Sequence, residues 1–171
     1  MTDVKRVQAR YEGGMAFASR TGSGHAIPVD DGNGDSGPRP TELLMAALAT
    51  CTGMDVVSIL AKKRQAPVAY TVHATGEQRD AYPQVFTTIE LLHDVEGPDL
   101  DVAAVRRSIE LSARKYCPIN AMVSAGPTTV HHRYRVRRTG GEPLDESGEV
   151  CVTGPYERPQ VDAERPQVDA D

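Results

Sequence analysis

Three cysteines, Cys51, Cys117 and Cys151, are the side chains of this sequence best suited to covalent chemistry. Cys51 lies in an apolar segment, and Cys117 directly precedes a proline. A thiolate can attack a peroxide oxygen, and a second thiol can then close a disulfide. If the segments of Cys51 and Cys117 pack together, their Cα atoms can reach the separation of about 4.4–6.8 Å that a disulfide needs. The alternative is structural, because free cysteine is often buried as a small apolar side chain.

Metal and hydrolytic sites have weaker support in the sequence. The odd number of cysteines and the lack of a Cys-x-x-Cys pair argue against a disulfide framework and against a closed zinc site. His131 and His132 are neighbours on a predicted strand, so they point to opposite faces, and His132 is expected in the core. No motif places a histidine beside Cys51, which disfavours a Cys–His hydrolase. We expect no metal and no cofactor.

Composition limits the classes of partner. The chain has 171 residues, with 24 acidic and 19 basic side chains and a net charge of −5. This acidic balance argues against nucleic acid or an anionic membrane as the main partner. No apolar run approaches the length of about 18–20 residues that spans a membrane, and the start has no apolar signal core. We expect a cytoplasmic protein.

Residues 41–64 are predicted to form the central helix that carries Cys51. The segment has no interior proline, Pro40 suits its first position, and its last turn is basic. Its apolar side chains cover nearly every direction and do not form a single stripe. Such a helix must be surrounded by protein.

The other segments alternate between strand and helix patterns. The expected elements are strands near 7–11, 15–19, 25–30, 68–76, 85–93 and 129–138, a helix at 101–117 and a short helical turn at 119–126. In the second helix, apolar positions recur every three or four residues as far as Tyr116. The arginines of residues 133–138 are expected to form a solvated strand face. This order predicts an α+β fold in which a sheet covers helices.

A domain boundary is predicted near Thr139. Residues 1–139 form the predicted domain, and residues 140–171 are expected to be a flexible C-terminal tail with no sustained period of 2 or 3.6. The tail ends in a direct repeat of ERPQVDA. Cys151 falls inside this tail, so we expect an incidental surface thiol there.

The two cysteine segments, GPRPTELLMAALATCTGMDVVSILAKKR and ARKYCPINAM, together resemble the OsmC/Ohr family, in particular its OsmC-like branch. The resemblance covers roughly residues 4–137. It implies an intertwined homodimer in which antiparallel sheets wrap around two long central helices. It also implies a thiol peroxidase for organic hydroperoxides, with the active site at the subunit interface. By this resemblance Cys51 is the attacking thiol and Cys117 the resolving thiol, and an external dithiol reduces their disulfide.

Two other family positions do not match cleanly. The hydroperoxide-resistance branch has an arginine after a Gly-Gly turn near the start, where this chain has Met15. That branch also has a glutamate directly after the proline that opens the central helix. Here Pro40 is followed by Thr41, and Glu42 comes one step later. One step rotates a helical side chain by about 100°, so the direction of Glu42 differs.

Candidates for the cation that ionises Cys51 are therefore Arg39 and Arg20, with Glu42 expected to hold the Arg39 guanidinium. Their ordinary roles are a solvated loop charge for Arg39 and a first-turn acid for Glu42. Asp55, one turn beyond Cys51, is either a like charge that disfavours a thiolate or a buried, hydrogen-bonded acid or interface contact.

A second class of function stays open on the same residues. The chain can be a dimeric binding module that holds a small apolar ligand at its interface and uses the cysteines only for packing. Treatment with an organic hydroperoxide discriminates the two classes, since only a peroxidase forms the disulfide.

Overall fold

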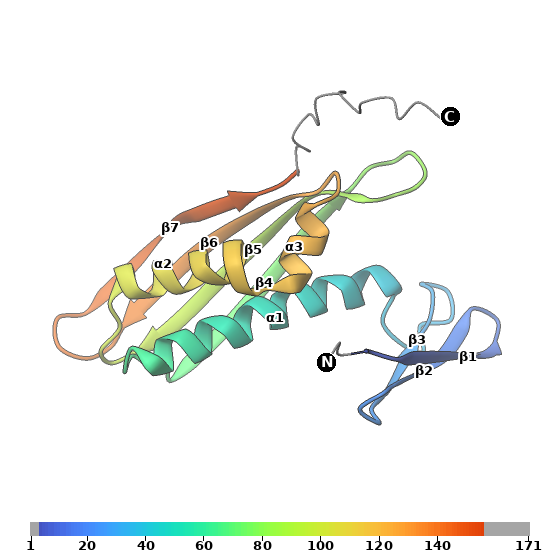
Figure 1. Cartoon of the computed structure of the whole chain (residues 1–171), viewed down its shortest axis with the longest axis horizontal. Helices are drawn as coiled ribbons and strands as arrows, with labels where there is room; N and C mark the ends of the chain where they lie inside the picture. Colours follow the sequence, from blue (N-terminus) through green and yellow to red (C-terminus); the bar gives the residue numbers. More distant parts are fainter. Residues whose placement is uncertain (1–3, 156–171) are drawn as a thin grey trace, which may run out of the picture.

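The computed structural model describes residues 4–155 of the chain. Two antiparallel or mixed sheets and a set of helices make up the α+β fold that the sequence predicts. The smaller sheet has the order β1–β2–β3 and the larger one β4–β5–β6–β7. All helices lie on one face of the larger sheet, with the long α1 beneath the shorter α2 and α3 in the view of Figure 1. The repeat at residues 157–170 lies outside the described residues.

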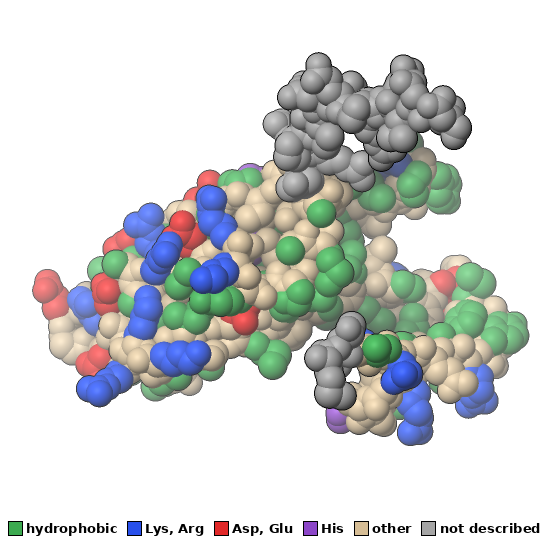
Figure 2. Space-filling view, in the orientation of Figure 1, with side chains coloured by type: hydrophobic (Ala, Val, Ile, Leu, Met, Phe, Trp, Pro, Cys, Tyr) green, Lys and Arg blue, Asp and Glu red, His purple; other side chains and the backbone are tan. Residues whose placement is uncertain are grey.

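The smaller sheet is an antiparallel meander of β1 (Val7–Gly13), β2 (Ala16–Thr21) and β3 (Ala26–Val29), as predicted. It stands beyond the N-terminal end of α1 (Figure 1). Tyr11 and Met15 are 61% and 63% exposed on its hairpin. Figure 2 shows hydrophobic side chains together with several basic ones over this end of the molecule, whereas basic and acidic side chains intermingle over the opposite end. The meander therefore presents apolar surface to its surroundings.

α1 (Pro40–Lys62) is the predicted central helix and starts at Pro40, as expected. Only one of its faces is covered within the chain. The buried residues are Leu48, Ala49, Thr52, Gly53, Val56 and Leu60. On the other side Met54 is 75% exposed and Val57 42%. A single chain thus leaves much of an apolar helix open.

The length and composition of α1 correct one expectation. An 18-residue window of α1 has a mean hydropathy of 1.9, so by these criteria the helix is long and apolar enough to cross a membrane. Interspersed Thr, Gly, Asp and Ser residues break the apolar run of α1 but leave its mean hydropathy high, so the uninterrupted run is shorter than the apolar helix. A third of that window is buried inside this chain (33%), and core helices of soluble proteins pass the same test.

The larger sheet consists of β4 (Ala69–Gln78), β5 (Phe86–Gly97), β6 (Thr129–Arg138) and β7 (Leu144–Thr153). β5 and β6 run parallel, whereas the other neighbours are antiparallel, so the expectation of purely antiparallel sheets was wrong. The reason is the connection: the chain leaves the C-terminal end of β5, passes through the helices and returns to the end where β5 begins before it enters β6. Parallel neighbours require such a crossover.

β7 corrects the predicted boundary at Thr139. Residues 144–153 pair with β6 as an edge strand and are not a flexible tail. Cys151 is 6% exposed, so it is not a surface thiol. The pairing shifts register between His132 and Arg133, where Val150 is the extra residue of a bulge. The bulge reverses which positions face inward, so the sequence shows no sustained alternation.

The second helix also departs from expectation near its end. α2 (Val102–Leu111) gives way to a π-helical turn, η1 (Ser112–Tyr116), and then to α3 (Pro118–Ser124). A π-helical turn holds one more residue than an α-helical turn, so the residue that faces the core after it comes one position later in the sequence. Tyr116, expected to be buried, is 49% exposed, whereas Cys117 is only 3% exposed. The turn therefore directs Cys117 inward.

The outer face of the larger sheet is solvated, as predicted for its arginines. Three of them pair with carboxylates of neighbouring strands: Arg133 with Glu90, Arg135 with Asp145, and Arg137 with Asp94 and Glu96. The fourth, Arg138, donates to the Glu142 carbonyl oxygen. Because these charges are paired locally, the row is not a free basic patch for a polyanion.

Candidate functional site

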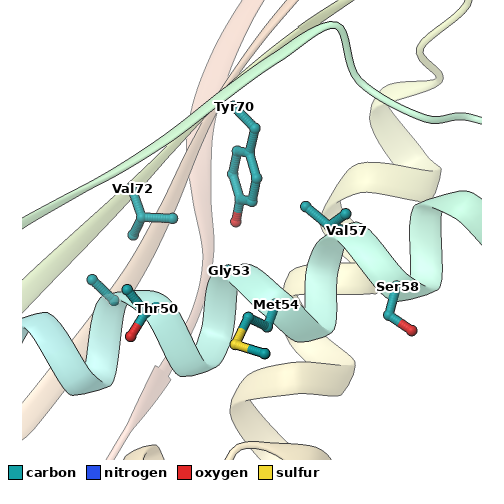
Figure 3. Close-up of a pocket in the computed structure, with 8 residues that line it drawn as sticks. Thr50, Gly53, Met54, Val57, Ser58, Tyr70 and Val72 are labelled. Atoms are coloured by element: carbon teal, nitrogen blue, oxygen red, sulfur yellow. The ribbon is translucent and has the colours of Figure 1, made fainter. Parts of the chain in front are cut away.

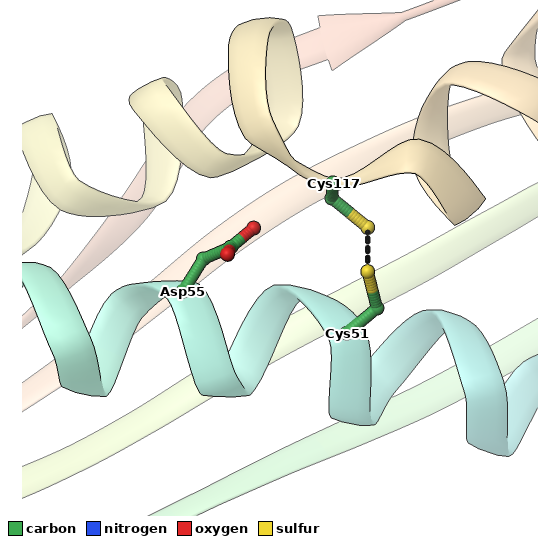
Figure 4. A group of neighbouring side chains, drawn as sticks. All are labelled: Cys51, Asp55 and Cys117. Atoms are coloured by element: carbon green, nitrogen blue, oxygen red, sulfur yellow. Dashed lines mark hydrogen bonds between the residues drawn. The ribbon is translucent and has the colours of Figure 1, made fainter. Parts of the chain in front are cut away.

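The structure brings Cys51 and Cys117 together. The Cys117 thiol donates a hydrogen bond to the Cys51 sulfur, with the two Sγ atoms 2.7 Å apart (Figure 4). Cys51 comes from the middle of α1 and Cys117 from the junction of η1 and α3. The approach of the two helical segments, which the sequence left as a condition, is therefore met. Both cysteines are free thiols.

Local backbone structure fixes the position of Cys117. The Cys117 N–H closes the π-helical turn by donating to the Ser112 carbonyl oxygen (2.9 Å). Its sulfur caps α3, accepting from the Asn120 N–H at 3.3 Å. Pro118 suits the first helical position, because the N–H that proline lacks would have no partner within the helix there. The Asn120 side chain in turn donates to the Ala113 carbonyl oxygen (2.8 Å), so the junction is held on both sides.

The two thiols differ in their environment. Burial, together with the hydrogen bond to Cys51, raises the pKa of Cys117 to about 12. Cys117 therefore keeps its proton at neutral pH and can donate it to the neighbouring sulfur. Cys51 is half-buried, whereas Cys117 is buried. The Cys117 thiol directs its proton at the Cys51 sulfur, and Cys51 is the more accessible of the two thiols, so this arrangement suits a nucleophile at Cys51.

Asp55 is the third member of the cluster. One turn along α1 from Cys51, its carboxylate and the two sulfurs lie within 4.8 Å of one another (Figure 4). Ser112 donates a hydrogen bond to Asp55 Oδ2 at 2.9 Å. Asp55 is thus a hydrogen-bonded acid, one of the roles weighed above, though it is only half-buried. A group of this kind can hold a metal ion. No sequence motif predicts it, because its members come from distant segments.

Arg39 and Glu42 lie elsewhere. They form the expected pair, with Arg39 Nη1 3.3 Å from Glu42 Oε1, and the Arg39 N–H donates to Glu42 Oε2 (2.9 Å) to cap α1. Cys51 is twelve residues further on, about 18 Å along a helix that rises 1.5 Å per residue. Arg20 is an exposed residue of β2 in the meander. The structure therefore brings neither arginine to Cys51 of the same chain.

A chain of buried polar side chains, missed by sequence reasoning, runs behind Cys117. The Tyr70 hydroxyl lies 2.6 Å from His93 Nδ1, the His93 and His132 rings stack at 5.9 Å, and His132 Nε2 lies 3.1 Å from Asn120 Oδ1. Burial lowers the pKa of His93 to about 3 and of His132 to about 4. His132 is a core histidine, as predicted, but its Nδ1 has no hydrogen-bond partner among the described residues. The burial of His93 could have been predicted from the alternation of β5, because His93 continues the inward-facing series of Ile89 and Leu91.

An apolar hollow of about 530 Å³ lies on the neighbouring face of α1 (Figure 3). Gly53, Met54 and Val57 of α1 form its floor, and Tyr70 and Val72 of β4 form its wall. α1 passes close to β4 at Gly53, where a Cβ would lie in ordinary van der Waals contact with Val72 at 3.5 Å. Cys51 does not line the hollow, although its neighbours in sequence do.

Comparisons with known proteins place this arrangement in a family. The profile of the family "OsmC-like protein" matches residues 32–132, which span Cys51 and Cys117. The chain belongs to the OsmC-like family. Protein YhfA of Escherichia coli K12 is 39% identical over 131 residues, which is 77% of this chain and 97% of YhfA.

Solved structures agree with the OsmC-like assignment. A hypothetical protein from Aquifex aeolicus matches with a TM-score of 0.73 at 28% identity, over 80% of this chain and 98% of that one. OhrB of Bacillus subtilis, an organic hydroperoxide resistance protein, matches with a TM-score of 0.56 at 19% identity, over 77% of this chain and 98% of OhrB. The second likeness is one of fold.

Proposed function

We propose that this OsmC-like protein is a cysteine-based thiol peroxidase that reduces organic hydroperoxides in oxidative stress defence. One observation carries the proposal: the Cys117 thiol donates to the Cys51 sulfur at 2.7 Å. A disulfide needs two sulfurs that approach to about 2.05 Å with compatible backbone positions. Here α1 and the start of α3 already hold both thiols side by side, so the resolving step requires only side-chain movement.

The reaction proceeds in three steps. The Cys51 thiolate attacks the terminal oxygen of the hydroperoxide, the O–O bond breaks, and the alkoxide takes a proton and leaves as alcohol. Cys51 is then a sulfenic acid. The Cys117 sulfur attacks the Cys51 sulfur, the S–O bond breaks, and water leaves with the thiol proton. Two electrons have passed from the sulfurs to the peroxide. An external dithiol returns them and restores both thiols.

The environments of the two thiols support this order of roles. Cys51 is half-buried, so a substrate can reach it. Cys117 is buried and its pKa is raised, which suits a thiol that waits for the sulfenic acid. Small and aliphatic side chains of α1 surround Cys51, which favours an organic hydroperoxide over hydrogen peroxide. The need for a reducing dithiol fits a cytoplasmic protein.

The proposed enzyme is a homodimer that binds neither nucleic acid nor membrane. The exposed apolar face of α1, with Met54 75% and Val57 42% exposed, is the surface that a second copy would cover. Activation of Cys51 by Arg39 or Arg20 then takes place across the subunit interface, since neither reaches it within the chain. Met54→Lys should shift the size-exclusion light-scattering mass towards the monomer. Tyr82→Lys, at a residue that is 88% exposed on the β4–β5 loop, is the matched control.

Intact-mass measurement under denaturing conditions tests the peroxidase directly. The reduced protein is mixed with one equivalent of tert-butyl hydroperoxide, with Cys51→Ser and Cys151→Ala alongside. Wild type and Cys151→Ala should each lose two hydrogens and yield a peptide that links Cys51 to Cys117. Cys51→Ser should not form this link. A wild type that stays fully reduced and consumes no peroxide overturns the proposal.

The hollow favours a second candidate, a binding module for a small apolar ligand. In that case the cysteines are packing residues and the hollow is the site. The same mass experiment separates the candidates, because a binding module forms no peroxide-dependent disulfide.

A further inference from the structure

Cys51, Asp55 and Cys117 present three ligand atoms to one point. The two sulfurs and a carboxylate oxygen lie within 4.8 Å of one another. In tetrahedral zinc coordination, with Zn–S bonds of about 2.3 Å and Zn–O bonds of about 2.1 Å, two sulfurs stand about 3.8 Å apart and a sulfur and an oxygen about 3.6 Å. The sulfurs, now 2.7 Å apart, reach this geometry if they separate by about 1 Å.

Neighbouring groups already orient two of these ligands. Ser112 donates to Asp55 Oδ2, and no hydrogen bond to Asp55 Oδ1 is seen among residues 4–155, so Oδ1 can bind an ion. The Asn120 N–H donates to the Cys117 sulfur, and the Asn120 side chain is itself anchored to the Ala113 carbonyl. Partners of this kind hold metal ligands in place and raise metal affinity. Cys51 and Asp55 are one helical turn apart, so they lie on the same side of α1.

From this juxtaposition we propose that Cys51, Cys117 and Asp55 of the reduced protein bind one thiophilic divalent ion, Zn²⁺ in particular. Two sulfur ligands select such an ion over Mg²⁺ and Ca²⁺, which prefer oxygen. Three protein ligands leave the fourth position to water or a small anion, as in open zinc sites. Both cysteines bind such an ion as thiolates.

The ion and the disulfide exclude each other. A disulfide removes both sulfur ligands, and a single carboxylate does not retain Zn²⁺ at micromolar concentration. When a hydroperoxide oxidises the bound dithiolate, the two sulfurs give two electrons to the peroxide. The peroxide takes two protons from solvent and becomes alcohol and water, and Zn²⁺ is released. Conversely, bound Zn²⁺ is coordinated by the Cys51 sulfur, which is then not available to attack a hydroperoxide. The binding site itself requires only reduced thiols and does not rest on the peroxidase activity.

Equilibrium dialysis of the reduced, chelator-treated full chain against Zn²⁺ tests the site, with bound metal measured by mass spectrometry. Wild type and Cys151→Ala should bind one ion per chain. Asp55→Asn should weaken binding about tenfold or more, and Cys51→Ser and Cys117→Ser should abolish it. Co²⁺ gives a second readout, a sulfur-to-cobalt charge-transfer band that both cysteine variants should lack. Circular dichroism confirms that each variant is folded.

Equal Zn²⁺ affinity in wild type and Cys51→Ser overturns the site. Equal Zn²⁺ affinity in wild type and Asp55→Asn overturns the role of the Asp55 carboxylate as a ligand. Hydroperoxide should release the ion from wild type, measured with a colorimetric zinc indicator. Retention of Zn²⁺ after disulfide formation contradicts the exclusion. A wild type that binds no Zn²⁺ but forms the disulfide in chelator overturns only this inference. One that binds Zn²⁺ but ignores peroxide overturns only the peroxidase.

Discussion

Cys117 and Cys151 are both buried thiols, yet their surroundings differ in kind. They are 3% and 6% exposed, and burial raises the pKa of both. Cys117 has a second thiol at 2.7 Å and caps a helix. Cys151 lies on an edge strand, where the Arg114 guanidinium partly counteracts the rise in its pKa. Burial alone therefore does not mark a redox cysteine.

The two cysteines also differ in whether a positive charge or a second thiol lies beside them. Sequence reasoning looked for an arginine to identify the reactive cysteine. Within the described chain, an arginine lies at Cys151, whereas Cys51 has a thiol and a carboxylate as neighbours. Two features distinguish the candidate site from Cys151: a second sulfur lies beside Cys51, and Cys51 itself is only half-buried. The experiments that follow test this distinction.

The largest effect is expected for the attacking thiol. Cys51→Ser should lower the rate of hydroperoxide consumption at least about a hundredfold, because the nucleophile is lost. Cys151→Ala should leave that rate unchanged within about twofold. The rate is measured with excess dithiothreitol as the reductant. A Cys151→Ala variant as inactive as Cys51→Ser would break the comparison.

Cys117→Ser should preserve the attack but stop turnover. The variant should consume about one equivalent of hydroperoxide per chain and accumulate a sulfenic acid at Cys51, which a dimedone adduct reports by mass. Wild type and Cys151→Ala should give a disulfide and little adduct. Equal adduct yield in wild type and Cys117→Ser would show that Cys117 does not resolve the intermediate.

His132 lies between the two regions, since it contacts Asn120 and pairs in register with Cys151. Its folded-state pKa of about 4 is below the usual value of 6.5, so the unfolded chain takes up the proton first. Its stabilising contribution is therefore full above pH 6.5 and lost as the pH falls towards 4. The loss between pH 7 and pH 5 is about 2 kcal/mol.

Urea unfolding at pH 7 and pH 5 measures that loss. His132→Gln should reduce the difference between the two free energies of unfolding by about this amount. His73→Gln, at an exposed position of β4, should leave it unchanged. An equal pH dependence in wild type and His132→Gln would contradict a buried neutral imidazole.

The smallest effect concerns Arg114. Because its guanidinium holds the pKa of Cys151 down, Arg114→Gln should raise that pKa and slow alkylation of Cys151 by about two- to threefold at pH 8. Alkylation of Cys51 should not change. Iodoacetamide labelling followed by peptide mass spectrometry gives both rates from one sample. A similar slowing at both cysteines would show a general effect on access.

The parts of the molecule that could be predicted are those set by local pattern. The apolar character of residues 41–64 and the proline after Cys117 gave α1 and the end of the second helical segment. β7 was missed because a bulge at Val150 and polar inward positions hide its alternation. The hydrogen bond from Ser112 to Asp55 joins residues far apart in sequence, so no local pattern contains it.

The positions of Arg39 and Arg20 show another limit. Sequence proximity to the helix start suggested that Arg39 could serve Cys51, and the structure confirms the pairing of Arg39 with Glu42. It also shows that this pairing caps the N-terminal end of α1, whereas Cys51 lies in the middle of the helix. A motif gives residue types and spacing, but distance along a rigid helix decides which groups can meet within one chain.

The π-helical turn at residues 112–116 acts as a spacer of one residue. Shortening it by a single residue to an ordinary α-helical turn would rotate everything after it by about 100° relative to α2. Val105 and Ile109 would keep their places in the core, while the sulfur of Cys117 would face away from Cys51. Redox competence in this scaffold can therefore be gained or lost through one insertion or deletion, with both cysteines retained.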